Sequence, residues 1–139
     1  MYPEYFIAPM REELTRHGVE EARTPEDVDR LLTADGEESV LMVVNSVCGC
    51  AAGKARPGIV QALQNEVKPD KAATVFAGGD VEAVAHLRQI LSEYPPSSPS
   101  VALFKGGKPV YFMPRSSIEG SDALTISENL KQAFREHCA

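Results

Sequence analysis

Two cysteines stand one residue apart in the sequence, in the segment Cys48-Gly49-Cys50. Closely spaced cysteines point to redox chemistry or to metal binding. If a helix begins directly after this segment, the thiols lie at its N-terminus, where unpaired backbone amides and the helix dipole stabilise a thiolate. Because the thiolate is the species that attacks a disulfide, this position predicts a nucleophile.

The single residue between the cysteines affects the disulfide that they would form. A bond between Cys48 and Cys50 closes a small, strained ring, and strained disulfides are more oxidising and more easily reduced than relaxed ones. The spacing therefore predicts a labile active-site disulfide. If Cys48 attacks first, Cys50 is placed to displace a mixed disulfide from it.

The neighbouring residues support this interpretation. Gly49 keeps the turn narrow, and the side chains of Asn45 and Ser46 are able to satisfy backbone amides of the loop. Lys54 and Arg56 follow within two helical turns and add positive charge. Positive charge favours a thiolate, and it would also attract an acidic thiol substrate.

Two other interpretations of the cysteines remain open. Free cysteines are often packed in the interior as small hydrophobic residues. A metal site needs about four ligands, and Cys48, Cys50, His137 and Cys138 would supply that number. The sequence has no second closely spaced cysteine pair, which makes the metal signal weak.

Hydrophobic periodicity predicts the elements that hold these residues in place. The expected helices and strands are helices at 4–17, 25–32, 51–67, 80–92 and 122–137, and strands at 40–45, 72–77, 101–104 and 110–113. Pro57 predicts a kink in its helix, and Asp80 is expected to cap the helix that it begins. The order predicts an α/β sandwich in which a parallel β-α-β unit is extended by an antiparallel hairpin.

Pro99 immediately precedes one of the predicted strands. A peptide bond before proline adopts the cis form at low cost, so a cis bond is one interpretation of this position. The simpler interpretation is an ordinary proline at the entry of a strand.

The composition limits the class of protein. The chain has 139 residues, enough for one domain over residues 1–139, with 43% hydrophobic and 24% charged residues, as in a folded globular protein. Lys and Arg number 14 against 20 Asp and Glu, which gives a net charge of −6. This acidic balance argues against nucleic acid as the main partner.

The apolar segments of the chain are short. The longest uninterrupted one covers residues 40–44, far less than the roughly 20 residues that a membrane-spanning helix needs. The first residues lack the basic and apolar regions of a signal peptide, so we expect a cytoplasmic protein. The three cysteines are an odd number, which argues against a closed framework of structural disulfides.

A longer motif surrounds the cysteine pair. It reads NSVCGCAAG at residues 45–53, followed by ARP at 55–57. This motif resembles the signature of the bacilliredoxins, bacterial thioredoxin-like proteins with a Cys-Gly-Cys site. Tyr2-Pro3 and the segment 99–109 also resemble that family, so the similarity covers nearly the whole chain.

The resemblance implies a thioredoxin-like α/β/α sandwich with a mixed central sheet and two additional N-terminal helices. It also implies that Cys48 attacks, that Cys50 resolves the mixed disulfide, and that Pro99 is a cis-proline opposite them. The implied reaction removes bacillithiol from S-thiolated client proteins. Bacillithiol would then be a low-molecular-weight thiol co-substrate, with no tightly bound cofactor. A disulfide reductase or isomerase activity is also associated with the family.

Two positions depart from ordinary thioredoxins, which have Trp-Cys-Gly-Pro-Cys and a buried acid six residues before the first cysteine. Here Val47 stands at the Trp position and Met42 at that of the acid. The missing carboxylate argues against efficient general dithiol reduction. Two alternatives remain, a general disulfide reductase or isomerase that does not use bacillithiol and a non-catalytic metal-binding module. The sequence does not indicate an oligomeric state.

Overall fold

A mixed five-stranded sheet forms the centre of the protein in a computed structural model, which describes residues 1–32 and 37–139. The strand order is β1-β3-β2-β4-β5. The strands are β1 (Glu20–Glu21), β2 (Ser39–Asn45), β3 (Lys71–Phe76), β4 (Ser100–Lys105) and β5 (Lys108–Met113). β2 pairs in parallel with β3 and antiparallel with β4, and β5 continues the antiparallel side.

The central strand β2 is buried along its whole length. Leu41 and Val43 belong to the hydrophobic cluster on one face of the sheet, while Met42 and Val44 belong to the cluster on the other face. Alternate residues of a strand point to opposite faces, so a continuous apolar segment suits a strand covered on both sides. This confirms the prediction made from the apolar run at residues 40–45.

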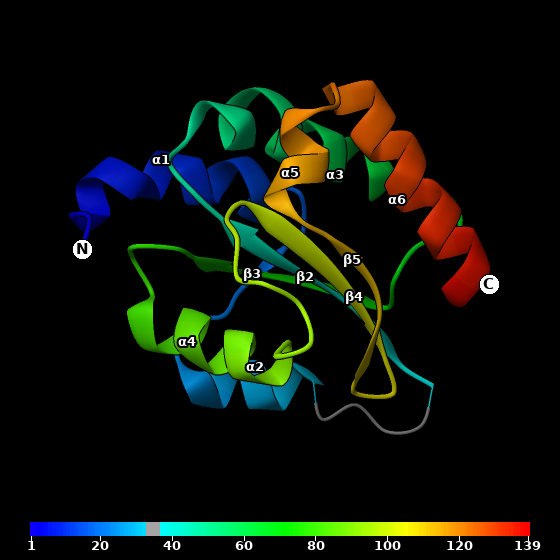
Figure 1. Cartoon of the computed structure of the whole chain (residues 1–139), viewed down its shortest axis with the longest axis horizontal. Helices are drawn as coiled ribbons and strands as arrows, with labels where there is room; N and C mark the ends of the chain where they lie inside the picture. The colour runs from blue at the N-terminus through cyan, green and yellow to red at the C-terminus, as the bar shows by residue number, and fades with distance from the viewer. Residues whose placement is uncertain (33–36) are drawn as a thin grey trace.

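Helices cover both faces of the sheet and complete the predicted sandwich (Figure 1). One face carries α1 (Glu4–Thr15), η1 (Ala51–Ala55), α3 (Arg56–Ala62), α5 (Arg115–Glu119) and α6 (Ala123–His137). The opposite face carries α2 (Pro25–Leu32) and α4 (Val81–Ile90). Among the described residues, no helix is both long enough and apolar enough to cross a lipid bilayer.

Local hydrogen bonds cap two helices, and a glycine turn joins β4 and β5 as the predicted hairpin requires. The hydroxyl oxygen of Thr24 accepts a hydrogen bond from the Asp27 amide at 3.1 Å and caps α2. The carboxylate of Asp122 accepts one from the Thr125 amide at 2.8 Å and caps α6. Gly106 and Gly107 form the two-residue turn between β4 and β5, with φ values of +59° and +79° that favour glycine.

The helix predicted at residues 51–67 differs from the observed one. The chain forms the π-helical turn η1 first, then the α-helix α3, which ends at Ala62. Pro57 lies in the first turn of α3, where its missing amide hydrogen costs least. The irregularity expected from Pro57 takes the form of this wider π-helical turn, which ends directly before the proline.

Asp80 occupies the N-cap position of α4, but its side chain makes no capping hydrogen bond, so its predicted capping role is wrong. Its carboxylate accepts two hydrogen bonds of 2.8 Å from the guanidinium of Arg11 and one of 3.0 Å from the Phe76 amide. Arg11 is only 2% exposed, and a buried guanidinium requires such a partner. The pair fastens α1 to the end of β3.

Two elements were not predicted from the sequence. β1 has only two residues and pairs with β3, and α5 has only five residues. Neither is long enough to produce a clear hydrophobic period.

The contact between α3 and α6 gives a first prediction, at Gly58. A Cβ atom there would lie 2.8 Å from Cγ2 of Ile126 and 2.9 Å from the carbonyl oxygen of Ala123. We expect Gly58→Ala to lower the free energy of unfolding by about 1–3 kcal/mol, because α3 and α6 must move apart. Urea denaturation measures this change.

Gly53→Ala is the matched control. A Cβ atom at Gly53 would have no atom within 4 Å outside its immediate neighbours, so this variant should be as stable as the parent or slightly more stable. Equal stability of the two variants would contradict the close approach of α3 and α6.

Candidate active site

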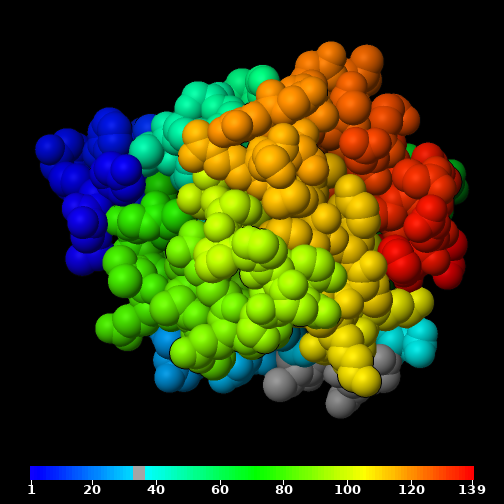
Figure 2. Space-filling view, in the orientation of Figure 1, coloured from blue at the N-terminus to red at the C-terminus, as the bar shows by residue number. Residues whose placement is uncertain are grey.

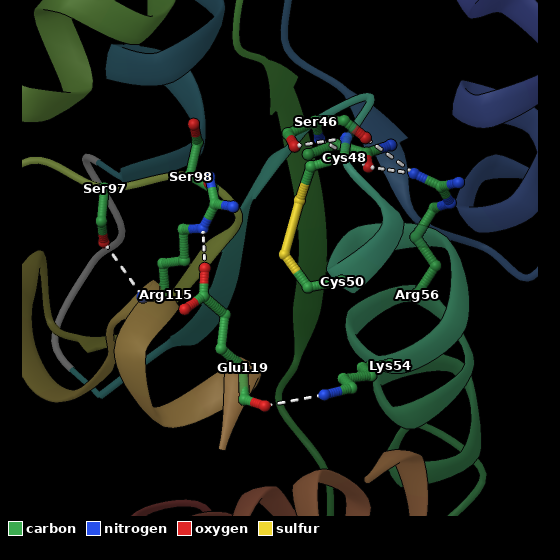
Figure 3. The surroundings of a disulfide bond; sticks show 10 residues. Ser46, Cys48, Cys50, Lys54, Arg56, Ser97, Ser98, Arg115 and Glu119 are labelled. Carbon is green, nitrogen blue, oxygen red and sulfur yellow. Dashed lines mark hydrogen bonds and ion pairs between the residues drawn. A yellow bond between two sulfur atoms is a disulfide. The ribbon is translucent and has the colours of Figure 1, made fainter. Parts of the chain in front are cut away.

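A disulfide between Cys48 and Cys50 lies just beyond the end of β2 (Figure 3). The two Cα atoms are 5.5 Å apart. Cys48 lies in the loop after β2, and Cys50 is the N-cap residue of η1. Cys50 packs against the hydrophobic cluster beneath η1, α3 and α6, while Gly49 is exposed. The cysteine pair therefore lies at the boundary between the protein surface and the hydrophobic core.

The loop before the disulfide is held by its own side chains. The Ser46 amide donates to Oδ1 of Asn45 at 2.9 Å, and the Cys48 amide donates to Oγ of Ser46 at 3.1 Å. The carbonyl of Cys48 accepts hydrogen bonds from the amides of residues 51 and 52 at 3.0 and 3.2 Å. This confirms that Asn45 and Ser46 satisfy amides of the loop.

Arg56 supports the same loop from below. Its Nη1 donates to Oδ1 of Asn45 at 3.0 Å and to the carbonyl of Ser46 at 2.9 Å. Its Nε donates to the carboxylate of Glu13 on α1 at 3.0 Å. The Arg56 side chain is 3% exposed. The expectation that Arg56 attracts an acidic substrate is therefore wrong, because its charge is buried and paired.

Helix α1 makes a second contact with this loop. Nδ2 of Asn45 donates to the carbonyl of Met10 at 3.2 Å, so both ends of the Asn45 amide group are bonded. Together with Glu13, this contact makes α1 part of the support for the cysteines. Nothing local in the sequence predicts this contact, because α1 ends about thirty residues before the motif begins.

The loop that contains Pro99 lies on the other side of the disulfide (Figure 3). The Ser98–Pro99 peptide bond is cis, as the family resemblance implied. The hydroxyl oxygen of Ser97 accepts a hydrogen bond from the Arg115 amide at 3.2 Å, and the carbonyl of Ser98 accepts one from Nη1 of Arg115 at 3.3 Å. Arg115 thus joins this loop to α5.

Three charged residues beside the disulfide, Lys54, Arg115 and Glu119, are linked by hydrogen bonds (Figure 3). Nε of Arg115 donates to the carboxylate of Glu119, and Nζ of Lys54 donates to the carbonyl of Glu119 at 2.7 Å. Arg115 and Glu119 were missed in the sequence. Their spacing of four residues after Pro114 indicates a short helix, but nothing local places that helix beside Cys50.

Cys138 lies far from the other two cysteines. It follows α6 and is close to Ser39, which begins β2, and to Lys105, which ends β4 beside it. Cys48, in contrast, follows the other end of β2. β2 has seven residues, so roughly 20 Å separates these two ends. Burial raises the pKa of the Cys138 thiol.

This separation contradicts the four-ligand metal site considered for the cysteines. His137 and Cys138 lie together at the end of α6, and the His137 carbonyl accepts a hydrogen bond from Nζ of Lys105 at 2.8 Å. In residues 1–32 and 37–139, no group of three or more His, Cys, Asp or Glu side chains is arranged to hold a metal ion.

Comparison with known proteins shows full-length relatives. The family described as "Disulphide isomerase" matches residues 2–138. A protein named bacilliredoxin from Salinibacter ruber is 49% identical over 138 residues, covering 99% of this chain and 80% of the relative. Bacilliredoxin BH1716 from Halalkalibacterium halodurans is 47% identical over 137 residues, covering 99% of this chain and 94% of the relative.

Solved structures show the same fold at low sequence identity. A thioredoxin from Malassezia sympodialis has a TM-score of 0.61 and 15% identity, with 87% of this chain and 91% of that chain covered. Oxidised thioredoxin from Plasmodium falciparum has a TM-score of 0.59 and 18% identity, with 87% of this chain and 99% of that chain covered. The fold is therefore thioredoxin-like, with helices on both faces of a mixed sheet, as the resemblance implied.

The hydrogen bonds of Arg56 give a second prediction. We expect Arg56→Gln to lower the free energy of unfolding by about 2–4 kcal/mol, because the substitution removes a buried charge and leaves loop acceptors unpaired. Urea denaturation of the oxidised protein measures this. Arg30→Gln is the control, since Arg30 is 57% exposed and its ion pair with Glu20 should contribute less than about 1 kcal/mol. Equal losses would contradict a supporting role for Arg56.

The raised pKa of Cys138 gives a third prediction. A higher pKa leaves less thiolate at a given pH, so Cys138 should react with iodoacetamide more slowly in the folded protein than in the unfolded chain. The rate should continue to rise with pH above the range of an ordinary cysteine. Mass spectrometry of a Cys48→Ser, Cys50→Ser variant, with and without urea, isolates this reaction. Equal rates in both states would contradict the effect of burial.

Proposed function

We propose that this chain, which belongs to the bacilliredoxin family and is a thiol–disulfide oxidoreductase, removes bacillithiol from S-bacillithiolated client proteins. The observation that carries the proposal is the Cys48–Cys50 disulfide at the end of the central strand of a thioredoxin-like fold. A disulfide there indicates that the two sulfurs approach closely enough to exchange a bond. The client proteins and bacillithiol are the partners of this reaction, and no tightly bound cofactor takes part.

The proposed reaction begins with Cys48 as a thiolate. Its sulfur attacks the bacillithiol sulfur of the mixed disulfide on the client, forming a bond between Cys48 and bacillithiol. The bond to the client sulfur breaks, and the client leaves as a thiolate that takes a proton from water. Cys50 then attacks the sulfur of Cys48, which releases bacillithiol and forms the Cys48–Cys50 disulfide. An external thiol reductant restores the two thiols.

The surroundings of the two cysteines support this order of attack. Cys50 packs against the hydrophobic core, which leaves its sulfur less open to a large substrate. Cys48 lies in the loop outside that core, and its own amide is bonded to Ser46. The proposed nucleophile is thus the cysteine in the loop, and the proposed resolving cysteine is the one that packs against the core.

The proposed place of this reaction is the cytoplasm. Bacillithiol is a thiol co-substrate here, and a reducing compartment is needed to regenerate the dithiol after each turnover.

A second function is general reduction or isomerisation of protein disulfides. The description "Disulphide isomerase" of the matching family favours it. Met42, which is fully buried in β2, weighs against it, because a methionine at this position supplies no carboxylate to move protons during dithiol chemistry.

A test of the proposed roles uses Cys50→Ser and Cys48→Ser. When reduced Cys50→Ser is mixed with a bacillithiolated client, we expect bacillithiol to remain trapped on Cys48 and the client to be released. Cys48→Ser should not transfer bacillithiol, because Cys50 is packed against the core. Intact-mass spectrometry detects both the adduct and the free client.

A client carrying glutathione is the control substrate. Little transfer of glutathione would support specificity for bacillithiol, whereas equal transfer of both thiols would favour a general oxidoreductase. If Cys50→Ser accumulates no adduct from either client, Cys48 is not the attacking thiol.

A further inference from the structure

Two positively charged side chains flank Cys50 and share one partner. Lys54 is on η1, four residues after Cys50, and Arg115 begins α5. Both donate hydrogen bonds to Glu119. Lys54 donates to the backbone carbonyl of Glu119 at 2.7 Å, and Arg115 donates to the carboxylate of Glu119. Figure 3 shows Arg115 and Glu119 across the disulfide from Arg56, and Lys54 below Arg56, with its ammonium group pointing toward Glu119.

The side chains of Lys54 and Arg115 have more hydrogen-bond donors than the acceptors bonded to them. An ammonium group has three donors and a guanidinium has five. Among the residues that the structure describes, the Lys54 ammonium donates to one acceptor, and the Arg115 side chain donates to Glu119 and to the Ser98 carbonyl. The Arg115 side chain is 44% exposed, so its remaining donors are able to reach a molecule in solution.

Arg56 provides an internal comparison. Its side chain is 3% exposed and is bonded to Asn45, Ser46 and Glu13, so it has no surface to offer a substrate. Lys54 and Arg115 are thus the cations beside the disulfide that solvent reaches, in a chain whose net charge is −6. In the space-filling view, the surface of α5 (orange) lies between η1 (teal) and the segment near residue 97 (yellow-green) (Figure 2).

We propose that Lys54 and Arg115 form a subsite that binds the carboxylates of the low-molecular-weight thiol transferred to Cys48. This inference rests on the proposed function and names the part of the substrate that is recognised. Bacillithiol carries carboxylates on its malyl group, and a guanidinium and an ammonium are the side chains that pair with such groups. In the free protein, the guanidinium of Arg115 donates a hydrogen bond to the Glu119 carboxylate. The incoming carboxylate replaces Glu119 as the acceptor of that bond.

The subsite would decide which sulfur is attacked. A mixed disulfide offers two sulfurs, one on the client and one on the small thiol, and attack on the client sulfur would leave the client attached to Cys48. A carboxylated thiol held beside Cys50 presents its own sulfur to Cys48. The Cys48 sulfur then bonds to the small thiol, and the client leaves with the electrons of the broken bond.

The test compares two matched probes on one client peptide. The peptide carries a mixed disulfide with either mercaptopropionate or mercaptopropanol, which differ in the carboxylate. In the Cys50→Ser background, we expect Lys54→Gln with Arg115→Gln to slow transfer of mercaptopropionate by about threefold to tenfold. The share of Cys48 that carries client instead of small thiol should rise. Transfer of mercaptopropanol should slow much less, because loss of the Arg115 bond to the Ser98 carbonyl affects both probes alike, whereas loss of carboxylate binding affects only mercaptopropionate.

Two further variants sharpen the comparison. Glu119→Gln frees the guanidinium of Arg115, so it should speed transfer of mercaptopropionate and leave mercaptopropanol unaffected. Arg135→Gln removes one exposed positive charge on α6 and is the control for the loss of a single charge, to be compared with each single variant, Lys54→Gln and Arg115→Gln; it should change neither rate. Added salt should reduce the preference for the carboxylated probe, because exposed charges are screened.

The outcomes separate this inference from the proposed function. If the Lys54, Arg115 double variant slows both probes equally or neither, while Cys50→Ser still takes bacillithiol from its client, the subsite is overturned and the proposed function stands. If Cys50→Ser forms no adduct with bacillithiol or with either probe, both proposals are overturned.

Discussion

The buried guanidinium of Arg56 is the interaction on which the site depends. It links three segments that are distant in the sequence, because it bonds the end of β2, the loop after it and α1 from its own place at the start of α3. A buried charge is stable only when its donors are matched by acceptors. The requirement that Asn45, Ser46 and Glu13 supply those acceptors fixes the loop in one conformation and holds Cys48 above the core.

A second buried pair extends this arrangement through α1. Arg11 is bonded to Asp80, just after the C-terminal end of β3, while Met10 and Glu13 of the same helix bond to Asn45 and Arg56, which support the disulfide loop. The N-terminal helix is therefore anchored at both the cysteine loop and the β3–α4 connection. This explains why it packs as part of the layer that covers one face of the sheet, rather than as a separate appendage.

The cations around the disulfide have different electrostatic roles. Arg56 is buried, paired and structural, whereas Lys54 and Arg115 are more accessible and share Glu119. Disulfide exchange with a mixed disulfide needs both a reactive sulfur and a choice between two target sulfurs. The asymmetry of charge around Cys48 and Cys50 provides a physical basis for that choice.

Local patterns in the sequence were sufficient to predict much of the frame. The apolar run at residues 40–45 indicated a strand covered on both faces, and the Cys-Gly-Cys segment followed it directly. The helix starts predicted at residues 25 and 122 lie within one residue of those of α2 and α6, because the signals at a helix start are local: Thr24 and Asp122 each accept a capping bond from a residue three positions later. Asn45 and Ser46 were identified for the same reason, since their bonds to the loop are also local.

Only the tertiary structure decided the interactions between distant segments. Asp80 has the sequence context of a helix cap, but a buried Arg11 sixty-nine residues away takes its carboxylate, and the cost of an unpaired buried charge outweighs a capping bond. Arg56 has the sequence context of a charge near a thiol, but burial makes it a support for the loop. Arg115 and Glu119 reach the disulfide only because β5, one strand away from β2 across β4, ends at the same edge of the sheet as β2. Sequence spacing therefore identified the cysteine pair and the loop residues beside it, because these lie next to one another in the chain, and long-range packing determined which charges surround the pair.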